Sequence, residues 1–124
     1  MCTNKGRPKP SKRQVVQAKA AAHEPATDVE REALEAVYAY QEARSVQAGR
    51  PFRASRTWPM IEEHGVLVAV ERLVAKPDDS DCYKTLVEMG MEDLAFEQVV
   101  VPHLEAFSEK AVLVSETRLK RLKG

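Results

Sequence analysis

Hydrophobic residues recur at steps of three and four along most of this chain, which is the spacing of one face of an α-helix. The clearest case is the stretch from Thr27 to Ala48, where Thr27 and Glu30 form a T-x-x-E capping box and Gly49 stops the helix. Residues 66–75 are apolar on most sides and should form the most buried helix. Further helices are expected from a cap at Ser55 or Thr57 to His64, and over residues 81–89, 91–101 and 109–122.

These elements predict an all-α protein, a compact bundle of about five to six short helices. Residues 1–26 are predicted to be a flexible basic tail that is part helical, and residues 27–124 to be the helical domain. Within the tail, residues 11–22 have helix-forming composition but little to bury beyond Val15 and Val16. Their helix is therefore expected to form only in a complex.

Two stretches of the chain resemble each other. Residues 61–74 read IEEHGVLVAVERLV, and residues 86–100 read LVEMGMEDLAFEQVV. With one residue inserted after the glycine, Gly65 aligns with Gly90, and each unit becomes a short helix, a glycine stop and a second helix. Two stacked helix-Gly-helix units are one interpretation, and chance similarity between amphipathic helices is the other.

The net charge of zero hides an uneven distribution of charge. Residues 1–22 carry +6 and residues 118–124 carry +4, whereas residues 23–117 carry −10. Basic ends of this kind suit nucleic acid or an acidic patch on another protein, and they also occur as solubilising tails.

The cysteines and the hydropathy pattern indicate a compartment. No run of about 18 apolar residues is present, and no apolar stretch follows the basic N-terminus, so neither a membrane span nor a secretory signal is expected. Cys2 and Cys82 are far apart and have no partner motif, which argues against a disulfide framework or a zinc site. We therefore expect a cytoplasmic protein.

The basic tail contains the stretch KGRPKP, made up of Lys5, Gly6, Arg7, Pro8, Lys9 and Pro10. Over these six residues the chain resembles the AT-hook, whose core is Gly-Arg-Pro flanked by basic residues. An inserted Arg meets the enhanced negative potential of a narrow A·T-rich minor groove, while glycine lets the backbone lie close and proline keeps it extended. The resemblance implies groove contact through Arg7. Lys5 replaces the usual first Arg, which should weaken binding, and a solvated tail is the alternative.

The segment between Glu42 and Glu62 interleaves arginines with aromatic residues and contains no acid. Arg50, Arg53 and Arg56 are candidate secondary contacts to nucleic acid, because Arg can contact phosphates and stack on bases. The alternative is that the two aromatic residues of the segment, Phe52 and Trp58, anchor the linker on the core while its arginines pair with the acidic body.

No constellation for chemistry is present. The histidines His23, His64 and His103 sit in separate segments without a second ligand at metal spacing, and the paired carboxylates fall near helix starts or on polar faces. No nucleophile–base arrangement or phosphate-cradling glycine loop can be assembled. We therefore predict no catalytic residue, no metal site, no cofactor and no enzymatic activity.

Residues 53–108, in the two stretches 53–74 and 83–108, resemble small bacterial helical proteins of unknown function, which implies a bacterial helical module and no particular site. The predicted function is a non-enzymatic helical interaction module that is DNA-associated through a minor-groove-binding tail. The alternative is a protein–protein regulatory or accessory subunit with an incidental basic tail and no specific DNA binding. Expected partners are A·T-rich DNA and a protein partner or homo-oligomer, with no membrane and no small-molecule substrate.

Overall fold

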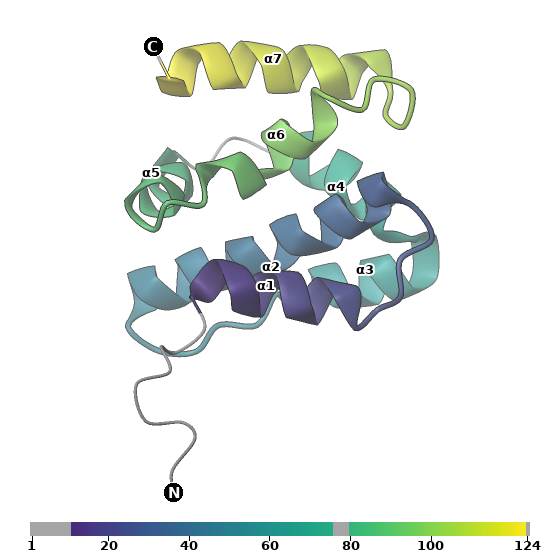
Figure 1. The fold of residues 1–124 in the computed structure, drawn as a ribbon. Helices are drawn as coiled ribbons and strands as arrows, with labels where there is room; N and C mark the ends of the chain where they lie inside the picture. The colour runs from purple at the N-terminus through teal and green to yellow at the C-terminus, as the bar shows by residue number, and fades with distance from the viewer. Residues whose placement is uncertain (1–10, 76–79, 124) are drawn as a thin grey trace, which may run out of the picture.

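The computed structural model describes residues 11–75 and 80–123, with side chains for 11–74 and 83–121, and these residues form an all-α bundle as predicted. The α-helices are α1 (Lys12–Ala21), α2 (Asp28–Ala48), α3 (Thr57–His64), α4 (Val66–Ala75), α5 (Ser80–Glu88), α6 (Phe96–Val100) and α7 (Glu109–Lys123), and a 3-10 helix, η1 (Glu92–Leu94), precedes α6. Figure 1 shows these helices stacked so that α2 and α6 lie between α1 and α7. None of the described helices is long and apolar enough to cross a membrane.

The central element is α2, which packs against α1, α4, α5, η1 and α6. Its core-facing side chains are mostly alanines that are almost completely buried: Ala33, Ala36, Ala39 and Ala43. Because alanine projects only one methyl group, neighbouring helices can approach the α2 backbone closely on several sides. Two apolar clusters form around this helix, one with residues of α1, α3, α4, α6 and α7 and the other with residues of α1, α5, η1 and α7.

Helix α1 belongs to the bundle, which corrects the expectation that residues 11–22 fold only with a partner. Val16 and Ala20 are fully buried, because the alanine face of α2 supplies the surface that α1 lacks on its own. Ser11 and Gln14 complete a reciprocal capping box that starts the helix. The helical body therefore includes residues 12–21, whereas the sequence placed its boundary at residue 27.

Arg13 ties α1 to the other half of the bundle. Its guanidinium donates to both carboxylate oxygens of Asp93, at 2.9 and 2.6 Å, and to the carbonyl of Gly90 at 2.6 Å. A second ion pair joins Lys12 to Glu42 of α2 at 3.0 Å. These contacts fix the start of α1 against both α2 and η1.

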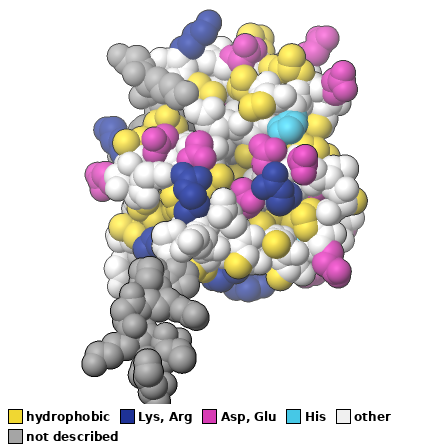
Figure 2. Space-filling view, viewed as in Figure 1, with side chains coloured by type: hydrophobic (Ala, Val, Ile, Leu, Met, Phe, Trp, Pro, Cys, Tyr) yellow, Lys and Arg dark blue, Asp and Glu magenta, His cyan; other side chains and the backbone are white. Residues whose placement is uncertain are grey.

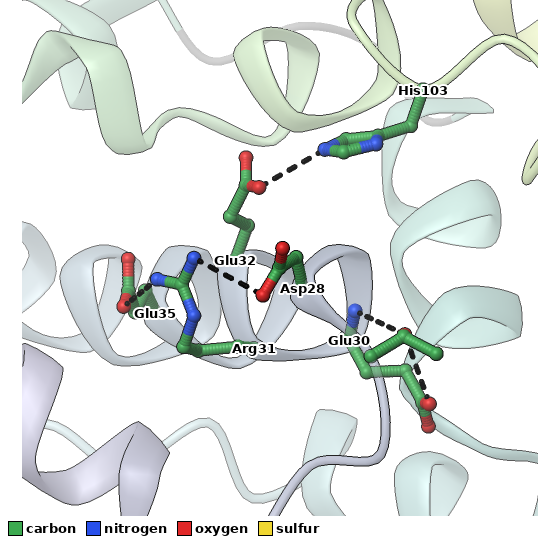
Figure 3. Close-up of polar contacts among 7 residues, drawn as sticks. Asp28, Glu30, Arg31, Glu32, Glu35 and His103 are labelled. Carbon is green, nitrogen blue, oxygen red and sulfur yellow. Dashed lines mark hydrogen bonds and ion pairs between the residues drawn. The ribbon is translucent and has the colours of Figure 1, made fainter.

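The two ends of α2 follow the sequence signals. At the start, the Glu30 N–H donates to Thr27 Oγ1 at 3.2 Å, and the Thr27 hydroxyl donates to the Glu30 carboxylate at 3.1 Å (Figure 3). The Glu30 side chain thus binds the hydroxyl of Thr27, where a full capping box would have it accept from the Thr27 backbone N–H. At the end, Gly49 adopts a φ of 69°, the left-handed conformation in which glycine ends helices. For α3, by contrast, neither expected cap operates, since Arg56 is its N-cap and makes no side-chain cap bond.

Residues 66–75 are expected to form the most buried helix; α4 buries Val66, Ala69, Val70 and Val74, but Val68 on its other side remains 40% exposed. The single helix predicted over residues 91–101 is wrong, because Ala95 adopts an extended conformation (ψ 150°) between η1 and α6. The two units with similar sequences therefore differ: α4 follows Gly65 directly, whereas η1 follows Gly90. Their second helices, α4 and α6, do pack against each other.

The Arg13–Asp93 contact predicts a specific dependence of stability on pH. The hydrogen bond from Arg13 lowers the pKa of Asp93, although partial burial opposes the shift. A lowered folded-state pKa adds stability above the unfolded value, near pH 4, and this stability is lost as pH falls through the folded-state pKa. Asp93→Asn should therefore destabilise the protein at pH 6, by no more than about 1 kcal/mol since the carboxylate is 61% exposed. The gap should close by about pH 2.

Urea unfolding at several pH values measures this effect. Glu116→Gln, on the exposed side of α7, is the matched control and should follow the wild-type curve. A constant difference between Asp93→Asn and wild type across the pH range would contradict the assignment.

Candidate nucleic-acid interface

The hook residues Lys5, Gly6, Arg7, Pro8 and Lys9 lie outside the described residues. The secondary candidates, by contrast, are described. Arg50, Arg53 and Arg56 lie on the linker of residues 49–56, which joins α2 to α3 along the lower side of the molecule in Figure 1. All three side chains are exposed.

The linker backbone is fixed on α2 by polar contacts. Gln41 Oε1 accepts from the Ala54 N–H at 2.8 Å and from the Trp58 indole N–H at 2.6 Å. Ser45 Oγ accepts from the Phe52 N–H at 2.9 Å while its hydroxyl donates to the Gln41 carbonyl. The linker backbone is therefore fixed against α2, and the exposed arginine side chains extend from it.

Both aromatic residues of the linker region anchor it, as the sequence suggested. The Phe52 ring meets the Tyr40 ring edge-on, with centroids 5.9 Å apart, and the Arg44 guanidinium lies 5.5 Å from the Phe52 centroid. Trp58 is only 7% exposed and belongs to the main apolar cluster.

Three arginines of the linker, Arg50, Arg53 and Arg56, do not pair with the acids of the described part of the chain, which corrects the second half of that alternative for these residues. The side chains of Arg50, Arg53 and Arg56 form no hydrogen bond or ion pair with another described residue. Three acids of α2 are engaged with other residues, as Glu32 contacts His103, Glu35 contacts Arg31, and Glu42 contacts Lys12. Figure 3 shows Arg31 and His103 at two of these carboxylates. In Figure 2, acidic and basic side chains interleave across the visible front, and Lys or Arg side chains appear at the lower edge.

An aromatic cluster that the sequence did not reveal lies beside the linker. The His23 ring stacks on Trp58 with centroids 5.5 Å apart and 1° between the planes, and the Tyr38 ring lies 4.9 Å from Trp58. His23 Nε2 is 2.7 Å from the Tyr38 hydroxyl. His23 reaches this position through a turn in which Glu24 has a φ of 52°, which is uncommon outside glycine.

Positive charge surrounds Tyr38. The Lys19 ammonium lies 5.7 Å from the centroid of the Tyr38 ring. Burial raises the pKa of Tyr38, and the positive charge of Arg53 opposes part of that rise. Tyr38 is thus the common neighbour of an α1 cation, a linker cation and the exposed imidazole of His23.

The described side chains include no group of three or more His, Cys, Asp or Glu residues that could hold a metal ion. The linker and the aromatic cluster together form a surface on which exposed cations lie over aromatic rings. Such a surface can contact phosphates and other anions.

No protein-family model, curated protein or solved structure matches the chain. The resemblance of residues 53–108 to small bacterial helical proteins therefore stays a prediction, as does the AT-hook resemblance of residues 5–10.

The Gln41 contacts predict how the linker responds to mutation. Gln41→Ala leaves two donors without their acceptor, the N–H of the buried Ala54 and the indole N–H of the buried Trp58. Each unsatisfied buried donor costs about 1–3 kcal/mol, so the free energy of unfolding should fall by about 2 kcal/mol or more. Urea unfolding followed by the fluorescence of Trp58, the single tryptophan, measures the change.

Gln17→Ala is the control, since Gln17 is exposed on α1 and the substitution should change stability by less than about 0.5 kcal/mol. If Gln41→Ala unfolds like this control, the linker is not held by Gln41.

Proposed function

We propose that this chain is a non-enzymatic helical interaction module that associates with A·T-rich duplex DNA. In this proposal, residues 5–9 enter the minor groove, and Arg50, Arg53 and Arg56 contact the phosphate backbone. The observation that carries the proposal is the state of these three arginines, which are exposed and have no carboxylate partner among the described residues. Arg13, Arg31 and Arg118, in contrast, each bind a carboxylate.

The geometry of α1 supports a joint role for the tail and the linker. Helices α1 and α2 run antiparallel, and the Lys12–Glu42 ion pair sets the start of α1 beside the C-terminal half of α2 (Figure 1). The linker begins where α2 ends. Four residues of extended chain reach about 14 Å, so Arg7 is tethered close to Ser11 at this end of the body. One duplex can therefore meet both the hook and the linker.

The two parts would contribute differently to binding. The hook supplies the preference for A·T-rich sequence, because a narrow minor groove attracts an inserted Arg. The linker arginines would add phosphate contacts, which orient the body on the duplex and carry no sequence information. Since the linker backbone is already held by Gln41 and Ser45, less conformational entropy is lost when its arginines bind.

Fluorescence anisotropy with A·T-rich and G·C-rich duplexes across a salt series tests this function. The full chain should prefer the A·T-rich duplex, and Arg7→Ala should lose that preference. Replacing Arg50, Arg53 and Arg56 by Gln should weaken binding to both duplexes alike. The slope of log K against the logarithm of salt concentration should become shallower by about 2.7, since three phosphate contacts are lost and each contributes about 0.9 to the slope.

The matched control replaces three exposed lysines on α5 and α7, namely Lys84, Lys110 and Lys120, by Gln. This variant has the same net charge as the linker variant and should keep most of the wild-type salt slope. Weak binding to both duplexes that neither Arg7→Ala nor the linker variant changes would overturn the proposal.

A protein–protein accessory role is the second candidate. Two exposed leucines on the α7 side of the molecule favour it, since Leu104 is 61% exposed and Leu113 is 65% exposed. Large apolar side chains left in water are common at contact surfaces for other proteins. On this reading the basic tail is incidental, and the duplex experiment would give the overturning result just described.

A further inference from the structure

His23 combines features that the fold alone does not require. Its side chain is exposed, yet its ring is stacked on Trp58 and hydrogen-bonded to the Tyr38 hydroxyl. The turn that holds it includes Glu24 in the left-handed region, where a residue other than glycine stores strain of about 1 kcal/mol or more. Strained turns of this kind persist where the surrounding structure fixes them, and they cluster at binding sites.

We propose that His23 is a proton-linked phosphate contact, and that duplex DNA bound at the basic surface takes up a proton on its imidazole ring. This inference rests on the DNA association proposed above and adds a residue that the sequence did not single out. The ligand chemistry is a phosphodiester, the same group that the linker arginines would contact.

The position of His23 suits a phosphate. The Lys19 ammonium lies 5.7 Å from the centroid of the Tyr38 ring, which the His23 ring also contacts, and the positive charge of Arg53 acts on Tyr38, so a phosphate near His23 would meet cationic surroundings. An imidazolium has two N–H donors, and the Tyr38 hydroxyl engages only Nε2. The remaining nitrogen is available for a phosphate oxygen.

Protonation is compatible with the contacts that His23 makes. The Tyr38 hydroxyl can donate to a neutral imidazole or accept from an imidazolium, so the 2.7 Å contact persists in both states. Burial raises the pKa of Tyr38, which keeps its hydroxyl neutral throughout the range in which histidine titrates. The Trp58 ring face attracts a cation stacked on it, and the C-terminal end of α1 lies beside His23 and favours positive charge.

The charged and titratable groups around His23 come from each neighbouring element. On these elements they are Lys19 of α1, Glu24 of the same turn, Tyr38 of α2 and Arg53 of the linker, and the charged residues nearest to Trp58 in sequence are Arg56 and Glu62. Three of these groups are permanent cations and two are carboxylates, so the surroundings attract a phosphate on balance. A phosphate attracts the imidazolium more than the neutral ring, so DNA binding and protonation of His23 must strengthen each other.

The test measures duplex affinity and its salt dependence at pH 7.5 and pH 5.5, for wild type and for His23→Gln. The wild type should bind about twofold to fivefold more tightly at pH 5.5, the size expected of one exposed charge contact. Its salt slope should steepen by up to about 0.9. His23→Gln should lose both changes. A purely structural role of His23 over Trp58 would leave the salt slope the same at both pH values.

His64→Gln is the matched control, because His64 is an exposed histidine at the end of α3 and should keep the wild-type pH response. Circular dichroism at pH 5.5 confirms that the variants are folded. Duplex binding with the same pH response and salt slopes in wild type and His23→Gln would overturn the role of His23 while leaving the proposed function intact. Absence of duplex binding at both pH values would overturn both.

Discussion

Close packing against the alanine face of α2 is the constraint on which the rest of this structure depends. Ala33, Ala36, Ala39 and Ala43 leave almost no exposed surface, and helices from both halves of the chain approach them. A larger side chain at these positions would push the neighbouring helices apart, since cores are packed without spare volume. Because α1 docks antiparallel on this helix, the start of the described chain and the linker after Gly49 come to the same end of the body.

The second consequence concerns charge. Ion pairs cross between helices of the bundle, such as Arg13–Asp93 between α1 and η1 and Arg118–Glu97 between α7 and α6. The Arg118–Glu97 pair, at 2.9 Å, is nearly buried, where breaking an ion pair costs more than it does at the surface. The linker stretch of residues 49–56, by contrast, carries three arginines whose side chains have no carboxylate partner among the described residues. Phosphate contact by that stretch is the basis of the proposed function.

Sequence signals predicted the ends of helices well where those ends depend only on neighbouring residues. The Thr27 cap and Gly49 gave the limits of α2, because capping and left-handed glycine act within a few residues. The docking of α1 was missed, since the stability of this helix depends on packing against an alanine face more than ten residues away in the sequence. The break at Ala95 was missed as well, and Arg13 reaches this region from α1 by binding Gly90 and Asp93.

The candidate site shows the same division. The anchoring of the linker by its aromatic residues followed from residue type. Whether the linker arginines find a carboxylate partner depends instead on where the acidic side chains of α2 point. The stacking of His23 on Trp58 joins residues 35 positions apart and has no periodic signal.

The most direct test of the proposed DNA interface is NMR mapping of backbone chemical-shift changes on adding an A·T-rich duplex. If the linker and the His23 surface contact DNA as proposed, the largest chemical-shift changes in the body fall on residues 49–56 and around Lys19 and His23. Largest shifts on α5 and α7, or none in the body, would contradict it.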